Sequence, residues 1–257
     1  MATVAVLTDS RRALQTVRKS MPRGGPSVVL CRSAPALFRV LESRLVDAIV
    51  FSPQDPHFAI VRQLRATFPD IPTFALAAFR PDEGELLLAC HREQVAGVLV
   101  EGVDDAVAGD LVQRASATAD RRRQLHDAPR ALRLLEPLQR DTWNLLLDTV
   151  DRPVRTAALA RRLRVSREHL SRQFGAGGAP NLKRVIDLTR IACAAHLLGN
   201  PGYDPVTVAK ILRFSSSSHL SGTARRIANS STRALGELGP RGVLAAFVGG
   251  NTRSRVG

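Results

Sequence analysis

The chain has 257 residues, of which 44% are hydrophobic and 23% are charged. This length suits one large domain or two ordinary ones, and this composition excludes a chain that is disordered throughout. There is no run of 18 apolar residues, and the first ten residues lack the basic start of a signal peptide. We therefore expect a cytoplasmic protein with no membrane partner.

The charge is divided unevenly along the chain. Residues 1–120 contain 13 basic and 14 acidic residues, whereas residues 121–257 contain 24 basic and 9 acidic residues, a net charge of +15. This difference predicts two domains with different roles, the second of which meets a polyanion or an anionic surface. The alternative is a basic surface that only keeps the protein soluble.

In the first half, short apolar runs alternate with segments of helical length, and the pattern ends near residue 123. Continuous apolar runs of this length suit strands that are buried on both faces. Five strand–helix units predict an α/β, doubly wound, five-stranded parallel sheet covered by helices on both sides. The predicted strands are residues 3–7, 26–30, 47–51, 72–76 and 96–100.

The helices between these strands have recognisable starts. Asp9 or Ser10 is suited to cap a helix that ends near Lys19, and Ser33 is suited to cap the next. Further helices are expected from Pro56 to Phe68, from Pro81 to His91, and as one long helix from near Asp104 through Arg121–Arg123 to Pro129.

This element order, with the phrases VDAIVFSP and DIPTFALAA, resembles the receiver domain of response regulators over roughly residues 2–123. The resemblance implies an acidic pair after the first strand, a phosphoacceptor Asp after the third, a Thr after the fourth and a Lys after the fifth. Those positions fall on Asp9 (preceded by Thr8), Ser52, Ala77 and Glu101.

These substitutions reduce the Mg²⁺-binding acidic pair to Asp9 and remove the nucleophile and the neutralising cation. The domain is therefore predicted to be a pseudo-receiver that cannot be phosphorylated and that serves dimerisation or partner sensing. A small ligand at the carboxyl ends of the strands is the alternative.

Residues 124–137 are predicted to form a linker between the domains. Leu132, Leu135 and Leu138 continue an apolar stripe, and Pro137 marks a helix start or a kink. The run Arg121–Arg123 is either a contact to DNA phosphate or a solvated linker face.

Residues 156–174 predict a helix, a tight turn and a second helix. Ala157, Leu159, Ala160 and Leu163 give the first helix a buried face, and Ser166 is suited to cap the second. Leu170 and Phe174 are spaced to face inward. The opposite face of the second helix then displays Arg167, Glu168, Ser171 and Arg172.

A second copy of this pattern follows about fifty residues later. Residues 206–214 form its first helix, Ser215 and Ser216 its turn, and residues 217–227 its second helix. An apolar helix over residues 182–198 connects the two copies and stops at the sequence GNPG. Two such units present two reading helices to successive turns of a duplex.

The motifs LARRLRVSREHLSRQF, IACAAHLL and VAKILRFSSSSHLSGTARRI resemble the DNA-binding domain of AraC/XylS transcription regulators, a bacterial type, over about residues 138–236. The resemblance implies that Glu168, Ser171 and Arg172 contact base edges. It also implies that Arg167, Lys183 and Arg184 lie near phosphates.

The second unit departs from the family pattern. Arg213 stands where Gly is usual before Phe214, and Gly222 stands where Arg is frequent. Short hydrogen-bonding groups and two arginines remain on its second helix: Ser217, Ser218, His219, Ser221, Arg225 and Arg226. We infer that the first unit reads sequence and the second mainly contacts the backbone; a silent second unit is the alternative.

The predicted domains are residues 1–123, receiver-like, and 138–238, AraC-type DNA-binding, followed by a tail over 239–257. No GxSxG or HExxH motif occurs, Cys31, Cys90 and Cys193 form no CxxC pair, and neither His169 nor His219 has a second ligand at metal spacing. We therefore expect buried, reduced cysteines, no cofactor, no metal and no enzymatic activity.

The function predicted is a nucleoid-associated transcription regulator whose partner is double-stranded DNA. RNA polymerase or another regulator is a further expected partner, and the protein is expected to be a homodimer. The alternative is an interaction protein that binds another transcription component with weak or no specific DNA binding.

Overall fold

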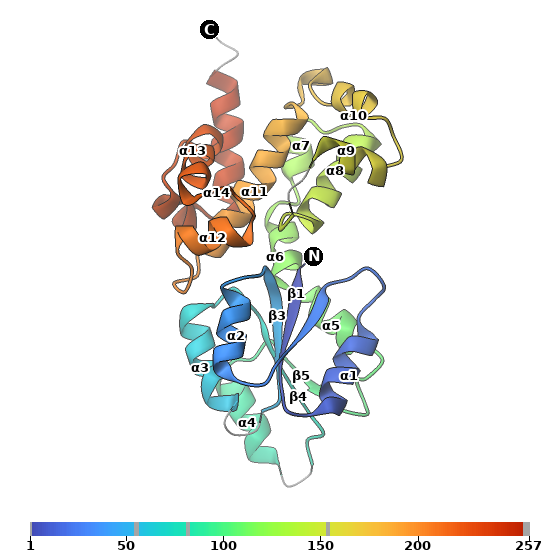
Figure 1. The fold of residues 1–257 in the computed structure, drawn as a ribbon, viewed down its shortest axis with the longest axis vertical. Coiled ribbons are helices and arrows are strands. Elements are labelled where there is room, and N and C mark those ends of the chain that lie inside the picture. Colours follow the sequence, from blue (N-terminus) through green and yellow to red (C-terminus); the bar gives the residue numbers. More distant parts are fainter. Residues whose placement is uncertain (1, 54–56, 81–82, 153–154, 254–257) are drawn as a thin grey trace. The chain divides into compact units, whose positions relative to one another are not determined.

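The structure, a computed structural model, describes residues 2–53, 57–80, 83–152 and 155–253. The chain divides into two compact units, Met1–Asp120 and Arg121–Gly257 (Figure 1). We describe each unit by itself.

The first unit is a five-stranded parallel sheet in the order β2-β1-β3-β4-β5. Its strands are β1 (Thr3–Leu7), β2 (Ser27–Cys31), β3 (Val46–Phe51), β4 (Thr73–Ala77) and β5 (Gly97–Val100). Each begins within one residue of its predicted start. This strand order is that of the flavodoxin-like doubly wound folds, which include receivers. The first unit is therefore receiver-like, and the predicted α/β fold class is confirmed.

Helices cover both faces of this sheet (Figure 1). They are α1 (Arg11–Ser20), α2 (Ala34–Leu41), α3 (His57–Thr67), α4 (Gly84–Arg92) and α5 (Ala108–Arg114). On one face, α1 and α5 pack on alternate strand residues in a core that includes Val4, Val6, Val50, Ala13, Val17 and Val112. The predicted caps are confirmed, since Ser10 accepts from the Ala13 N–H and Ser33 from the Ala36 N–H. The predicted helix starts at Pro56 and Pro81 lie outside the described residues.

The predicted long helix from Asp104 is wrong. Residues 101–107 form turns, in which Asp104 accepts from the Val100 N–H at 2.7 Å and Asp105 from the Gly102 N–H at 2.9 Å. A second break separates α5 from α6 (Ala117–Gln124), where the Ser116 hydroxyl accepts from the Ala119 N–H. Asp and Ser side chains offer the backbone these local partners in place of helical ones, and the helix is interrupted at both places.

Among the described residues of the second unit, every regular element is a helix, as predicted. It contains α7 (Ala128–Ala131), α8 (Pro137–Asp148), α9 (Thr156–Arg162), α10 (Arg167–Gln173), the 3₁₀ turn Ala176–Gly178, α11 (Leu182–Leu198), α12 (Pro205–Ile211), α13 (Ser217–Ala228) and α14 (Thr232–Arg253). The central element is α11, most of whose residues are buried. The final helix, α14, runs beside α11 (Figure 1). It is interrupted at Gly239, which comes directly before Pro240 and has a φ of 61° and a ψ of 179°.

The start of the second unit differs from the prediction at Arg121 and at Leu135. Arg121 is only 2% exposed, and its Nη1 lies 3.2 Å from Nδ1 of His196 on α11, so it is neither a solvated residue nor a phosphate contact. Arg122 is ion-paired with Asp148 of α8. In the apolar stripe, Leu135 is 67% exposed and Leu134 is buried in its place.

Cys31, Cys90 and Cys193 are buried, as expected, and burial raises the pKa of the Cys31 and Cys90 thiols. Among the described residues, none of the helices has the length and hydrophobicity needed to span a membrane.

Candidate nucleic-acid interface

The second unit contains two helix pairs, α9–α10 and α12–α13. Within each pair, the two helices are joined by a turn with the same backbone hydrogen bonds. In the first turn, the Val165 N–H donates to the Ala160 carbonyl at 3.0 Å and the Arg164 N–H to Arg161 at 3.2 Å. In the second, the Phe214 N–H donates to Ala209 at 2.8 Å and the Arg213 N–H to Lys210 at 3.2 Å. Both patterns are Schellman motifs.

The residue that closes each Schellman motif is left-handed. Arg164 has φ 56° and Arg213 has φ 57°, a region that glycine occupies at lower cost. The second turn has one more residue before its cap, because α10 is capped by Ser166 whereas α13 is capped by Ser216, two residues after Phe214.

The first pair is held from one side by apolar residues. Leu159 and Ala160 of α9 and Leu170 of α10 are buried, and so is Phe174, which follows α10. Ala157, expected on the buried face, is instead exposed, because it lies in the first turn of α9, and Leu163 is half-buried. The first pair therefore rests on fewer apolar contacts than its pattern suggested.

A buried glutamine that the sequence analysis did not identify ties α8 to the end of α10. Gln139 is 2% exposed, and its Nε2 donates to the Gln173 carbonyl at 2.6 Å. Its Oε1 accepts from the Glu136 N–H in a capping box at the start of α8. The sequence signal was available, because Glu-Pro-Leu-Gln places Gln at the capping-box position.

The outward face of α10 carries the predicted base-contacting residues. Glu168, Ser171 and Arg172 are exposed, as are Arg167 and His169. Among the described contacts, no ion pair or side-chain hydrogen bond within the protein is formed by Glu168 or Arg172.

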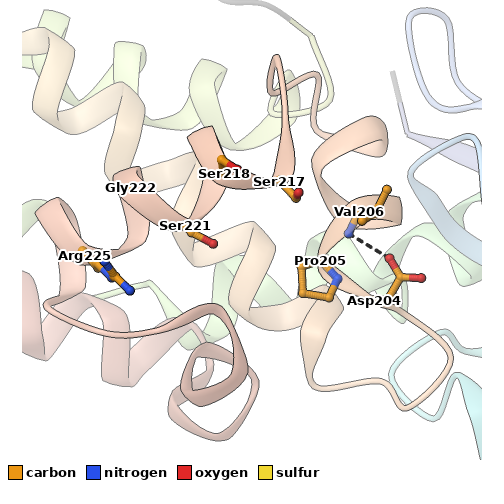
Figure 2. Close-up of a pocket in the computed structure, with 8 residues that line it drawn as sticks. All are labelled: Asp204, Pro205, Val206, Ser217, Ser218, Ser221, Gly222 and Arg225. Carbon is orange, nitrogen blue, oxygen red and sulfur yellow. Dashed lines mark hydrogen bonds between the residues drawn. The ribbon is translucent and has the colours of Figure 1, made fainter.

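In the matching place, the second pair displays short side chains and one arginine. A pocket of about 490 Å³ is lined by Ser217, Ser218, Ser221, Gly222 and Arg225, together with Asp204, which caps α12, and Pro205 and Val206 of α12 (Figure 2). A Cβ atom added to Gly222 would meet nothing within 4 Å. This face therefore has room for a partner but, apart from Arg225, no side chain long enough to reach a base edge.

His219 and Arg226 of α13 are exposed, and both form contacts with other residues of the protein. His219 Nδ1 lies 2.9 Å from the Ser215 hydroxyl, and its ring meets Phe214 edge-on at 5.5 Å. Arg226 donates to Oδ2 of the buried Asp187 at 2.9 Å. The structure thus places Arg226, a predicted phosphate contact, in an ion pair with α11, and its side chain remains 56% exposed.

The predicted phosphate contacts on α11 differ in their surroundings. Lys183 is exposed, with its Nζ 3.7 Å from Asp187. Arg184 is half-buried, and its guanidinium lies 4.8 Å from the Phe247 ring centroid of α14. Arg184 therefore packs against the protein in this structure.

Arg190 of α11 was missed by the sequence analysis. Its guanidinium lies 3.7 Å from the ring centroid of Phe214 and donates to the Leu212 carbonyl at 2.9 Å, at the end of α12. Burial lowers the pKa of this guanidinium, but the group stays protonated and positively charged at neutral pH. Arg190 fixes the second turn to α11, a role that no local pattern signals.

Four cationic side chains line one further pocket, of about 400 Å³. They are Arg155, Arg167, Lys183 and Arg190, and Thr156, Ala157, Ile186 and Asp187 complete the wall. The structure thereby brings together Arg167 and Lys183, two predicted phosphate contacts from different helices, and adds Arg155 and Arg190.

In the first unit, the degenerate receiver positions gather at the carboxyl edge of the sheet. Ser52, Ala77 and Glu101 line a pocket of about 430 Å³ there, whereas Asp9 is exposed. The Ser52 and Thr8 hydroxyls lie 2.6 Å apart, and Glu101 lies 3.8 Å from Arg12. Among the described residues, no group of His, Cys, Asp and Glu is arranged to hold a metal ion.

Comparison with known proteins gives only distant similarities. No protein-family model matches the chain, and no curated protein is significantly similar to it. A response regulator from Thermotoga maritima is 17% identical, over 45% of this chain and 97% of that one, with a TM-score of 0.40. Full-length FixJ from B. japonicum is 15% identical, over 88% of this chain and 96% of that one, with a TM-score of 0.38. The receiver-like assignment of the first unit depends on its strand order.

Proposed function

We propose that this protein is a sequence-specific, double-stranded-DNA-binding transcription regulator. The observation that carries the proposal is the pair of helix–turn–helix arrangements with equivalent Schellman turns, held by one buried helix in the unit whose residues have a net charge of +15. A basic domain in which the second helix of each pair, α10 or α13, has an exposed face is suited to bind the major groove of a duplex.

The two helix pairs have different tasks in this proposal. Arg172 bonds bidentately to guanine, Glu168 accepts from cytosine and Ser171 contacts either. The second pair contacts the DNA backbone through Arg225 and its serines, because Gly222 supplies no side chain. This division agrees with the resemblance of residues 138–236 to the AraC/XylS DNA-binding domain, because the departures from the family pattern, Arg213 and Gly222, fall in the second unit.

The receiver-like unit acts in this proposal as a module for dimerisation or for sensing another regulator or RNA polymerase. The Ser52 hydroxyl is hydrogen-bonded to the Thr8 hydroxyl, and a carboxylate, Glu101, stands at the position of the neutralising cation. Phosphoryl chemistry has neither its nucleophile nor its charge compensation there.

A second candidate function is favoured by the pocket on α13. Its serines, the open side of Gly222 and the 66% exposed Val206 make a surface whose two charged residues, Asp204 and Arg225, have opposite signs. Such a surface suits a protein partner better than a phosphate backbone. In that case the protein is an interaction partner of another transcription component.

DNA binding is tested by selecting bound sequences from random duplexes and measuring affinity for the best of them. Arg172→Ala is expected to cost roughly 1–3 kcal/mol and to relax preference at one base pair. The matched control is Arg241→Ala, an exposed arginine of α14. An Arg172→Ala protein with unchanged affinity and preference contradicts the assigned role of Arg172, and a wild-type protein that binds no duplex even in dilute salt contradicts the function.

A further inference from the structure

We propose that Arg155, Arg167, Lys183 and Arg190 form a clamp for one phosphodiester group of the DNA backbone. This inference rests on the proposed DNA-binding function and adds to it a specific contact site. The clamp residues come from three places in the chain: the residue before α9, the first residue of α10, and α11. They line a single pocket of about 400 Å³.

The charge balance of this pocket favours an anion. Its one carboxylate, Asp187, is buried and already bonded to Arg226 at 2.9 Å, with Lys183 at 3.7 Å. The wall therefore carries four cations against one carboxylate that has its own cationic partner outside the wall. Guanidinium groups suit phosphate oxygens because their N–H groups match two oxygens at once.

Arg190 supplies a second, independent observation. Its Nη2 is used by the Leu212 carbonyl, but its Nε is buried and has no hydrogen-bond partner among the described residues. A buried donor without an acceptor costs free energy, and a bound anion removes that cost. The same guanidinium is held over Phe214, so it needs little reordering on binding.

The position of Arg167 connects the clamp to sequence reading. Arg167 is the first residue of α10, one residue before Glu168. A phosphate held at this point fixes the start of α10 relative to the groove without itself distinguishing bases. The clamp thus contributes affinity equally to all duplexes and carries no sequence preference of its own.

The test measures the salt dependence of binding for Arg155→Gln and Lys183→Gln, with Arg140→Gln as control. Arg140 is an exposed arginine of α8 outside the pocket, and the same charge is removed. Each clamp variant is expected to make the negative slope of log affinity against log salt shallower by about one. This change is expected for selected and unrelated duplexes alike, so that the ratio of their affinities is unchanged. Melting temperatures check that each variant is folded.

The possible outcomes are separable. Wild-type slopes in both clamp variants, with intact wild-type binding, overturn the clamp and leave the proposed function standing. A wild-type protein that binds no duplex overturns both. Inorganic phosphate is titrated in parallel by NMR: if it perturbs the pocket in the wild type but the slopes stay unchanged, the pocket takes free phosphate and the assignment to DNA is wrong.

Discussion

At the scale of single residues, Arg164 and Arg213 show that the fold tolerates an unfavourable backbone conformation in each of the two turns. Arg164 and Arg213 both adopt left-handed backbone, where an L-residue with a Cβ is strained by roughly 1–2 kcal/mol. The Schellman hydrogen bonds and the buried Phe214 that follows Arg213 compensate for that strain. The departure from glycine seen in the sequence thus changes the energy of the second turn and leaves its shape intact.

Arg213→Gly is therefore expected to stabilise the protein by about 0.5–1 kcal/mol, the relief of strain being partly offset by the greater freedom of glycine in the unfolded chain. Chemical denaturation measures the change. The control is Lys210→Gly, at an exposed position inside α12, where glycine should cost about 1 kcal/mol. A destabilising Arg213→Gly contradicts the strain argument.

At the scale of elements, contacts between distant helices decide what local signals leave open. The caps at Ser10, Ser33 and Ser166 are local and were predicted from sequence. The packing of α14 on α11 is not local, and it depends on a residue without a side chain. A Cβ atom at Gly236 would lie 2.4 Å from the Leu198 carbonyl oxygen at the end of α11.

Gly236→Ala is expected to destabilise the protein by about 1–3 kcal/mol, because the contacted atom belongs to the backbone and moves only with its helix. Gly222→Ala is the matched control, since its added Cβ meets nothing within 4 Å and alanine favours a helix by about 1 kcal/mol. Thermal unfolding of the two variants should show shifts of opposite sign. Equal shifts would contradict the close approach of α14 to α11.

At the scale of the whole molecule, the two units differ in charge and in chemistry. The basic residues are concentrated in the helical unit, and the receiver-like unit is close to neutral. The carboxyl edge of the sheet retains a pocket, in which Ser52 and Glu101 stand at the positions of the phosphoacceptor and the neutralising cation. In the proposed function a signal therefore acts by binding and not by phosphorylation.

Acetyl phosphate with Mg²⁺ is accordingly expected to leave the mass, the oligomeric state and the DNA affinity of the protein unchanged. Mass spectrometry, sedimentation and binding assays check the three quantities, with a receiver that retains its acidic pocket treated in parallel. A stable gain of one phosphoryl group on an acidic residue would overturn the pseudo-receiver assignment.

The sequence alone determined the strands, most helix starts and the repeated helix pairs, because hydrophobic period and capping residues act over a few positions. Only the tertiary structure decided which charged residues remain available. Arg226 is paired with Asp187, 39 positions away, and Arg121 lies beside His196, 75 positions away. Arg155 joins Lys183 and Arg190 in one pocket. Side-chain partners that are distant in the chain leave no periodic signal. A sequence pattern therefore identifies an exposed face, but it does not identify which charged residues form contacts within the protein.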